Sequence, residues 1–376
     1  MIYLDNAATT SPKPFAVRKA VSEAMQLSAN PGRSGHDLSL KASEEIYRAR
    51  KTAAALFQAD SPMKVIFTLN CTTALNLVLK GLLKNGDHVV VSDLEHNAVM
   101  RPLHKLRDKG ITYSIAEVIA GDNDTTVDHF RQAINARTKL IVCTHASNVW
   151  GIRLPVERLA ALAHEYGLLM VVDAAQTAGV LPIDLSDNRI DFLCMAGHKG
   201  LYGPMGTGML IVNSDTLPDT LIEGGTGSHS LSLAQPEELP DRLESGTPNL
   251  SGIAGLRAGM AFVTQHRTDT IARHEFMLVQ RLYKGLASHR RVQLYTDEPQ
   301  PSDYVPLVSF NLKDTDSETA AQALNRQGIA VRAGWHCAPL AHRKMGTEDI
   351  GAIRISPSFF TKPSDIDRLL QILHRL

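Results

Sequence analysis

The chain has 376 residues, and its 39 basic side chains match its 39 acidic side chains, so it has no net charge when histidine is neutral. This balance gives no general attraction to nucleic acid or to an anionic membrane, and we expect neither as a partner. Hydrophobic residues make up 44% of the chain, as in ordinary soluble proteins, and no apolar run approaches the roughly 20 residues that cross a bilayer.

The first residues, MIYLDNAATT, lack the basic and apolar regions of a secretory signal, so we expect a cytoplasmic protein. The cysteines show no paired metal-ligand spacing, and we expect neither a metal site nor a disulfide framework. Three of the four are expected to be packing residues: Cys71, Cys143 and Cys194.

The first part of the chain predicts alternating strands and helices. Tyr3–Thr10 favours turns, Asn30–His36 is a loop by composition, and Asp37–Phe57 has the apolar spacing of a long helix. Strands are predicted at Val65–Thr68, His88–Ser92, Thr112–Ile119, Leu140–Thr144, Leu168–Val172, Phe192–Met195 and Met209–Val212. Helices are predicted between them at Thr72–Leu83, Asn97–Lys109, Val127–Ala136 and Val156–Tyr166. This order predicts an α/β fold with a mostly parallel sheet covered by helices on both faces.

The second part of the chain loses the strict alternation. Glu223–Ser251 is a long loop with the sequences GGTGSHS and ESGTPN, which we interpret as functional, and Ile253–His289 predicts two helices. Further strands are predicted at Val292–Tyr295, Pro306–Leu312, Ile329–Arg332 and Ala352–Ser356, with helices at Ser317–Gln327 and Pro363–Leu376. At about 150 residues per domain, we expect two domains. These are a large one over 15–254 and a smaller C-terminal α+β domain over 255–376, with residues 1–14 associated with the small domain and the active site.

A lysine and an aspartate follow two of the predicted buried strands. Asp173 comes directly after Leu168–Val172, and Lys199 follows Phe192–Met195 in the sequence MAGHKGLYGPMGTG. The carboxyl ends of strands in an open α/β sheet face the crevice where ligands bind. Alone, either residue is more often a surface lysine or a helix-capping aspartate. Together they predict pyridoxal phosphate, with Lys199 holding the aldehyde as a Schiff base and Asp173 keeping the ring nitrogen protonated.

Several residues are candidates to bind the cofactor's phosphate. Thr72 and Thr73 open a helix directly after a strand, where backbone N–H groups and hydroxyls can hold a phosphate, although ordinary helix capping is the alternative. His198, beside the lysine, is a second candidate donor. Thr247, in ESGTPN, is a third.

Three more polar residues follow predicted strands. His96 could stack on the cofactor ring and move protons, because its pKa lies near working pH, and an exposed histidine at a helix start is the alternative. Asn148 and Gln176 could donate to the phenolic oxygen of the cofactor. Turn or capping roles are an equal alternative for these two amides.

The C-terminal part contains a thiol and a guanidinium of interest. Cys337, in VRAGWHCAPL, lies between a strand and a loop next to polar and basic neighbours, which can activate a thiolate; an inert thiol is the alternative. Arg354 is the best candidate to clamp the α-carboxylate of an amino acid, because a guanidinium matches a carboxylate bidentately. A structural arginine is its alternative.

The chain resembles the class V aminotransferase family of fold-type I pyridoxal phosphate enzymes, and within it the cysteine desulfurases. The motifs occur in the family's order: YLDNAATT, NCTTALN, LEHNA, SNVWG, VVDAAQ, AGHKGLYGP, ESGTPN, RAGWHCAP and IRIS. The short segment between Arg332 and Arg354 resembles the group II branch, which includes selenocysteine lyase-like proteins.

The resemblance implies a role for each candidate. Lys199 would be the Schiff-base lysine, His96 would stack on the ring, and Cys337 would form a persulfide. The cofactor ligands would be Thr72, Thr73, His96, Asn148, Asp173, Gln176, His198, Lys199 and, across a homodimer interface, Thr247. The substrate ligands would be Arg354 and Asn148.

Two positions depart from the family pattern. Ala196 replaces a serine that many group II members carry before the lysine motif, and Cys71 replaces a glycine before the paired threonines. We expect phosphate binding to persist on the remaining donors. The two departures are compatible with a divergent branch of the family that acts on its own substrate.

The expected reaction converts L-cysteine to L-alanine and leaves sulfur on Cys337 for transfer to an acceptor protein. L-selenocysteine is the alternative substrate, as for a selenocysteine lyase. Transamination, epimerisation and carbon–sulfur β-lyase chemistry remain open within the same superfamily. A non-catalytic sulfur-transfer scaffold is the least favoured interpretation, because Lys199 and Asp173 are both present.

Overall fold

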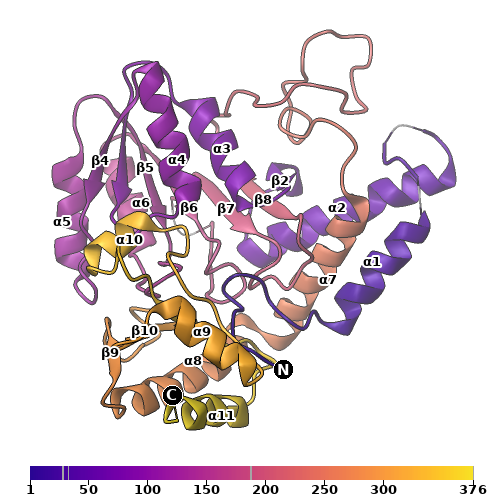
Figure 1. Ribbon diagram of the computed structural model, residues 1–376. Coiled ribbons are helices and arrows are strands. Elements are labelled where there is room, and N and C mark those ends of the chain that lie inside the picture. The colour runs from indigo at the N-terminus through magenta and orange to yellow at the C-terminus, as the bar shows by residue number, and fades with distance from the viewer. Residues whose placement is uncertain (28, 33, 187–188, 376) are drawn as a thin grey trace.

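A seven-stranded sheet organises the larger part of the protein in the computed structural model, which describes residues 1–27, 29–32, 34–186 and 189–375 (Figure 1). Across the sheet the strands are β2 (Val65–Thr68), β8 (Gly208–Val212), β7 (Phe192–Ala196), β6 (Leu169–Asp173), β5 (Thr138–Thr144), β3 (His88–Ser92) and β4 (Thr112–Ala116). The pairs from β7 to β4 are parallel, whereas β8 is antiparallel to both neighbours. The predicted mostly parallel sheet is confirmed.

The central strands are buried on both faces because their apolar residues run on without polar alternation. In β7, Phe192 and Cys194 belong to one buried cluster, whereas Leu193 and Met195 belong to another on the opposite face. Helices α3 (Cys71–Leu82) and α4 (Asn97–Leu106) contribute to the first cluster. The second contains residues of α2 (Asp37–Phe57), α5 (Asn123–Ala133) and α6 (Val156–Glu165).

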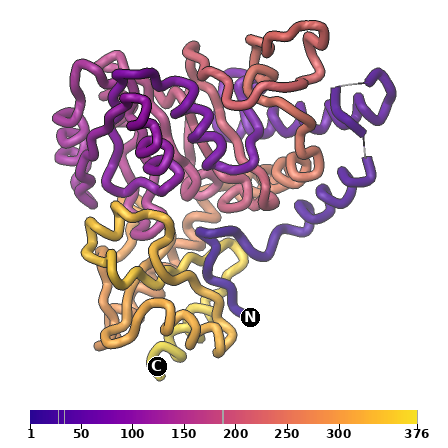
Figure 2. Tube along the Cα trace, turned by 45° about the horizontal axis from the view of Figure 1, so that its top comes forward, coloured from indigo at the N-terminus to yellow at the C-terminus, as the bar shows by residue number. Residues whose placement is uncertain are grey.

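The C-terminal elements lie below the large sheet in the view of Figure 1. Here β10 (Val308–Leu312) pairs antiparallel with both β9 (Val292–Leu294) and β12 (Ile353–Ile355). Around them lie α8 (Thr268–Ala287), α9 (Ser317–Arg326) and α11 (Pro363–Leu373), whereas the short α10 (Pro339–Lys344) lies against the larger part, where Lys344 pairs with Asp93 (Figure 1). The N-terminal strand β1 (Ile2–Tyr3) pairs with β11 (Ile329–Ala330), so the chain start runs beside the C-terminal elements (Figure 2).

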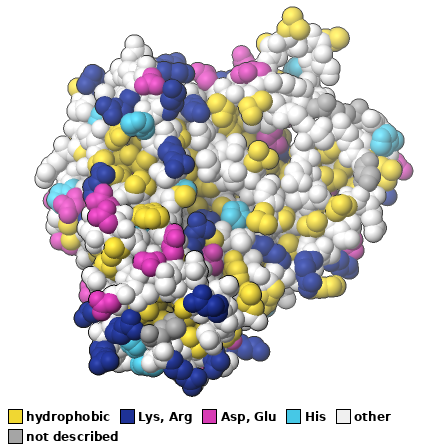
Figure 3. All heavy atoms as spheres, viewed as in Figure 1, with side chains coloured by type: hydrophobic (Ala, Val, Ile, Leu, Met, Phe, Trp, Pro, Cys, Tyr) yellow, Lys and Arg dark blue, Asp and Glu magenta, His cyan; other side chains and the backbone are white. Residues whose placement is uncertain are grey.

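Two long helices cover the remaining side of the molecule. Helix α1 (Phe15–Leu27) packs on α7 (Leu250–His266), which also contacts α2 (Figure 1). Short 3-10 turns precede β2 at Pro62–Lys64 and follow α4 at Arg107–Lys109. On the face shown in Figure 3, basic and acidic side chains are interspersed, as the balanced composition leads us to expect.

Some elements differ from the sequence prediction. Helix α1 was not predicted, and only Val17 within it is buried, so its apolar residues form no clear stripe. Helix α5 begins before the predicted residue 127, because Asp122 caps it and accepts the N–H of Thr125. Helix α10 falls where we expected a loop.

The division into two domains stays a prediction, and its boundary at residue 255 falls inside α7. Arg33 of the predicted loop and Leu376 of the predicted last helix lie outside the described residues. Among the helices that the structure describes, none combines the length and apolarity needed to cross a bilayer.

Candidate active site

The predicted functional residues meet at one edge of the large sheet. Strand β2 is antiparallel to β8, which is antiparallel to β7, so β2 runs in the same direction as the parallel strands. Their carboxyl ends therefore share an edge, which is where α/β sheets bind ligands. The residues that follow these ends are Cys71 after β2, His96 after β3, Asn148 after β5, Gln176 after β6, and His198 and Lys199 after β7.

Lys199 lies in the tight connection between β7 and β8. A Cβ atom added at Gly197 would come within 2.3 Å of Thr207 Oγ1, so this connection is closely packed. The carbonyl of His198 accepts hydrogen bonds from the Thr10 backbone N–H (3.1 Å) and from Lys13 Nζ (2.7 Å). The N-terminal segment thus fixes the lysine loop from outside, a contact that the sequence analysis did not assign to particular residues.

The surroundings of Lys199 favour its neutral amine. Burial lowers the pKa of Lys199, and the positive charge of Arg354 lowers it further, whereas the carboxylate of Asp173 opposes the change. A neutral amine is the form that adds to an aldehyde. The lysine is therefore prepared to bind a carbonyl cofactor.

Asp173 presents one open carboxylate oxygen. The residue is 4% exposed and ends β6. Its Oδ1 accepts the backbone N–H of Ala175 (2.9 Å) and the thiol of Cys71 (3.3 Å). Within the described part of the chain, no group donates to Oδ2. A buried carboxylate with an open oxygen suits a protonated ring nitrogen.

His96 is a neutral imidazole with a defined orientation. It caps α4, and its Nδ1 accepts the N–H of Ala98 at 3.0 Å, so the proton of the neutral ring is on Nε2. Burial lowers the pKa of His96. The preceding Glu95 accepts the hydroxyl of Ser92 and the N–H of Thr144, and thereby joins the ends of β3 and β5. Burial raises the pKa of Glu95 to about 8.

The predicted phosphate ligands have unequal surroundings. Asn70 caps α3, and its Oδ1 accepts both the N–H (2.9 Å) and the hydroxyl (3.2 Å) of Thr73. Thr72 is exposed. The ring nitrogen Nδ1 of His198 is buried and has no partner among the described residues, and burial lowers the pKa of this ring to about 4. His198 is thus a neutral side chain with unmet hydrogen-bonding capacity.

The two predicted amides hold neighbouring segments to the sheet edge. Asn148 Nδ2 donates to the carbonyl of His336 (2.7 Å), and Gln176 Nε2 donates to the carbonyl of Ala7 (3.1 Å). Asn148 Oδ1 is buried and has no partner in the described part of the chain. Their contacts with the phenolic oxygen of a cofactor stay a prediction.

Arg354 is brought to the site by β12 and is held by a residue from the chain start. It is 2% exposed, and its two terminal nitrogens bind the carbonyl of Asn148 (2.7 Å) and Asp5 Oδ1 (2.9 Å). Its Nε has no partner among the described residues. The sequence analysis missed Asp5, because an ion pair between the two ends of a chain leaves no local pattern.

Cys337 is exposed and lies next to the capping turn of His96. Both His336 and Cys337 have left-handed backbone angles, with φ of 50° and 56°, which non-glycine residues adopt only when other contacts hold them. The carbonyl of Cys337 accepts the N–H of Asn97 at 2.7 Å, and Asn148 binds the preceding carbonyl. The backbone of Cys337 is thereby fixed at the same edge as the imidazole, and its side chain is exposed.

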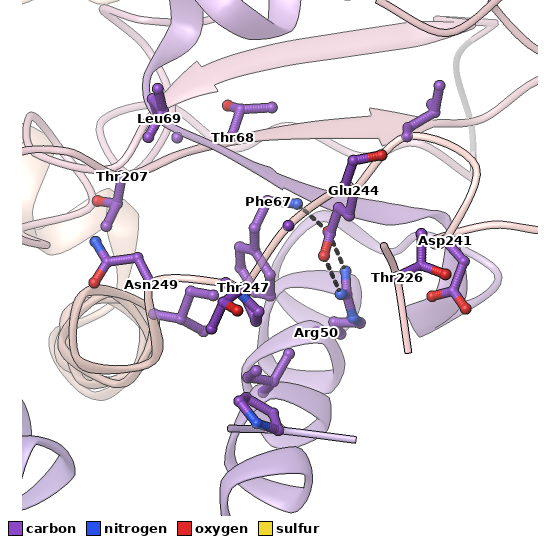
Figure 4. A pocket seen from close by; sticks show the side chains of 18 of the residues that line it. Arg50, Phe67, Thr68, Leu69, Thr207, Thr226, Asp241, Glu244, Thr247 and Asn249 are labelled. Atoms are coloured by element: carbon purple, nitrogen blue, oxygen red, sulfur yellow. Dashed lines mark hydrogen bonds and ion pairs between the residues drawn. The ribbon is translucent and has the colours of Figure 1, made fainter. Parts of the chain in front are cut away.

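Thr247 shares a cavity with only part of this group within its own chain. It lines a cavity of about 450 Å³ together with Thr73, and Lys199 is not part of its lining. Arg50 and Glu244 line the same cavity as Thr247 (Figure 4), and their side chains form an ion pair of 2.7 Å. A contact between Thr247 and the cofactor, including one across an interface, stays a prediction.

The residues at this edge fit pyridoxal phosphate. A lysine with a lowered pKa, a buried carboxylate with one open oxygen, and the unpartnered buried atoms of His198 and Asn148 supply the contacts that an aldehyde, a ring nitrogen and polar substituents need. Among the described residues, no group of three or more His, Cys, Asp and Glu side chains is placed to hold a metal ion.

The family profile described as Aminotransferase class-V matches residues 2–369. The chain belongs to the class-V aminotransferase family. As a member it is a pyridoxal phosphate-dependent enzyme of fold type I, as the sequence motifs led us to expect.

Similar proteins are named cysteine desulfurases. A cysteine desulfurase of Haloferax volcanii is 32% identical over 99% of this chain and 88% of its own. The apo structure of the cysteine desulfurase from Thermococcus onnurineus NA1 superposes with a TM-score of 0.91 at 32% identity, covering 100% of this chain and 94% of that one. The S-sulfonic acid form of the cysteine desulfurase CsdA from Escherichia coli gives 0.88 at 28% identity, over 99% and 94% of the two chains.

The buried pair of Arg354 and Asp5 yields a stability prediction. Replacing Asp5→Asn leaves the guanidinium buried without an opposite charge, and we expect the free energy of unfolding to fall by about 3 kcal/mol. The matched control is Asp367→Asn, which breaks the exposed pair with Arg281 and should leave stability nearly unchanged. Chemical denaturation of both variants checks this prediction. An Asp5→Asn variant as stable as the Asp367→Asn control would contradict it.

Proposed function

We propose that the protein is a cysteine desulfurase that converts L-cysteine to L-alanine and takes the sulfur as a persulfide on Cys337. The observation that carries this proposal is the hydrogen bond from the N–H of Asn97 to the carbonyl of Cys337, which holds the backbone of this exposed cysteine next to His96, at the edge that carries Lys199. The names of the similar proteins support the same reaction class.

Arg354 binds the substrate's α-carboxylate in this proposal. Its guanidinium stays charged and has an unpartnered Nε, while Asp5 and the carbonyl of Asn148 fix its plane. The substrate is thereby oriented with its α-carbon toward Lys199 and its thiol toward Cys337. The buried position excludes water from the clamp.

Lys199 and His96 move the protons. When bound, the cofactor supplies an electron-withdrawing ring that stabilises negative charge at the substrate's α-carbon. Lys199 Nζ takes the α-proton, and burial, which lowers the pKa of Lys199, favours the neutral amine that can accept it. His96 Nε2 is the position that exchanges a proton with the substrate thiol, since Nδ1 is occupied by the N–H of Ala98.

The sulfur step needs no external oxidant. The thiolate of Cys337 attacks the substrate sulfur, an S–S bond forms, and the bond between that sulfur and the substrate β-carbon breaks. The electron pair of the broken bond stays with the carbon skeleton, which takes up protons and leaves as alanine. In sum, one thiol and one cysteine give one persulfide and one alanine.

The persulfide sulfur then passes to a thiol of an acceptor protein, which can approach because Cys337 is exposed. A sulfur-accepting thiol must be kept reduced between turnovers. We therefore place the reaction in the cytoplasm, where thiols are kept reduced.

The active unit is a homodimer in this proposal, with Thr247 contributing to the cofactor site of the partner chain. Thr247 is exposed, and it lines a cavity with Thr207 of the β7–β8 connection, whereas Lys199 is not part of that lining. The loop preceding it projects from the body and carries the fully exposed Leu231 and Leu233, and hydrophobic side chains are visible at its tip (Figure 3). Exposed leucines of this kind are typical of a surface that a partner covers.

The Cys337→Ala variant tests the desulfurase proposal. We expect its rate of alanine and sulfide formation from L-cysteine under reducing conditions to fall by at least about 100-fold, because no nucleophile accepts the sulfur. Cofactor binding should persist, since the thiol is outside the cofactor contacts. Cys143→Ala, which alters a buried thiol on β5, is the control and should keep the wild-type rate.

An unchanged cysteine rate in Cys337→Ala would contradict the persulfide assignment. Activity on L-selenocysteine that survives the loss of Cys337 would identify a selenocysteine lyase instead. Formation of pyruvate, or of a second amino acid in place of alanine, would identify β-lyase, transaminase or epimerase chemistry.

Subunit mixing tests the role of Thr247. A dimer that combines a Lys199→Ala chain with a Thr247→Ala chain has one intact cofactor site if Thr247 acts across the interface, and none if it acts within its own chain. In a random mixture half of the dimers are mixed, so we expect the mixture to bind the cofactor with wild-type affinity at about a quarter of one site per chain, measured by absorbance after gel filtration. Absence of any tight site would contradict the proposal.

A further inference from the structure

The two oxygens of the Asp173 carboxylate have different surroundings. Oδ1 accepts two hydrogen bonds, from the N–H of Ala175 (2.9 Å) and from the thiol of Cys71 (3.3 Å). Oδ2 accepts none from the described residues. The carboxylate is thus held from one side, and Oδ2 is the oxygen that remains for a ligand at the sheet edge.

The backbone that carries Cys71 is fixed in place. Cys71 is the first residue of α3, and the preceding Asn70 caps the helix. Gly208 of β8 packs directly on Asn70, where a Cβ atom would come within 2.5 Å of the Asn70 carbonyl carbon. The helix start is therefore packed closely on the sheet, which fixes the backbone from which the Cys71 thiol reaches Asp173.

The Cys71 thiol is protonated and can therefore donate a hydrogen bond to Asp173. The side chain is 7% exposed and belongs to the same buried cluster as Cys194 and Ala196. Burial and the negative charge of Asp173 raise the pKa of the Cys71 thiol well above its ordinary value, so it keeps its proton. A thiol is a weak donor, which restrains the carboxylate without neutralising it.

We propose that Cys71 is a positioning residue that holds Asp173 so that Oδ2 meets the protonated ring nitrogen of pyridoxal phosphate. The residue acts through Asp173 and does not itself touch the substrate. This role gives a reason for a cysteine at a position where the family commonly has glycine. It rests on the cofactor that the family uses and not on the proposed substrate.

The test follows the ring nitrogen of ¹⁵N-labelled pyridoxal phosphate by NMR as a function of pH, with no substrate present. Without the thiol the carboxylate is less well aligned, so the nitrogen holds its proton less firmly. In Cys71→Ala we expect the pH at which the nitrogen loses its proton to fall by about half a unit to one unit. Cys71→Ser retains an O–H donor and should restore the wild-type midpoint.

Two further variants separate the hydrogen bond from packing. Cys71→Val fills the space without a donor, and we expect its ring nitrogen to lose its proton at the same pH as in Cys71→Ala. Cys143→Ala removes a buried thiol on β5, next to the strand that ends in Asp173, and should keep the wild-type midpoint. If the alanine variant does not fold, the serine and valine pair decides the question.

Unchanged midpoints in both the alanine and valine variants would overturn the proposal. A serine variant that titrates like the valine variant would also overturn it, because the effect would then come from packing. Since the measurement uses no substrate, its outcome is independent of whether L-cysteine is desulfurated.

Discussion

The buried negative charge of Asp173 is the feature on which the rest of the site depends. A carboxylate that is 4% exposed must be compensated, and the fold does so with groups that arrive on separate strand ends. Ala175 and Cys71 donate to one oxygen, while Lys199 and His96 both respond electrostatically to its charge. Its remaining oxygen is open to a cationic ring. Parallel pairing makes this possible, because only strands with a common direction deliver their following residues to one edge.

A second set of contacts joins the chain ends and the C-terminal elements to that edge. Asp5 pairs with Arg354 across 349 residues, and the carbonyl beside Lys199 is held by Lys13. Cys337 is fixed through Asn97 in a backbone conformation that it would not adopt alone. These contacts bring Arg354 and Cys337 to the sheet edge that carries Lys199 and Asp173. The N-terminal segment that contains Asp5 and Lys13 therefore helps to hold the residues of the proposed site in place.

The sequence predicts the sheet and most of its strand-end residues, because both depend on local pattern. Unbroken apolar runs predicted the buried strands, and the polar residue after each run predicted the edge. Helix α1 was not predicted, because Phe15 and Met25 are exposed, so its apolar residues are not confined to one face. The hydrogen bond from the N–H of Thr73 to Asn70, a residue just outside the predicted helix, was also not predicted. The thiol contact of Cys71 joins residues 102 positions apart, and such a pair can be found only once the fold is known.

The most direct test of the account is to locate the cofactor on the chain. The purified protein is incubated with pyridoxal phosphate, reduced with borohydride, digested and mapped by mass spectrometry. We expect the reduced cofactor to be attached to Lys199. The sharpest competitor is Lys13, because burial lowers its pKa to about 8 and its amine lies 2.7 Å from the carbonyl of His198. Attachment at Lys13, or at no single lysine, would contradict the account.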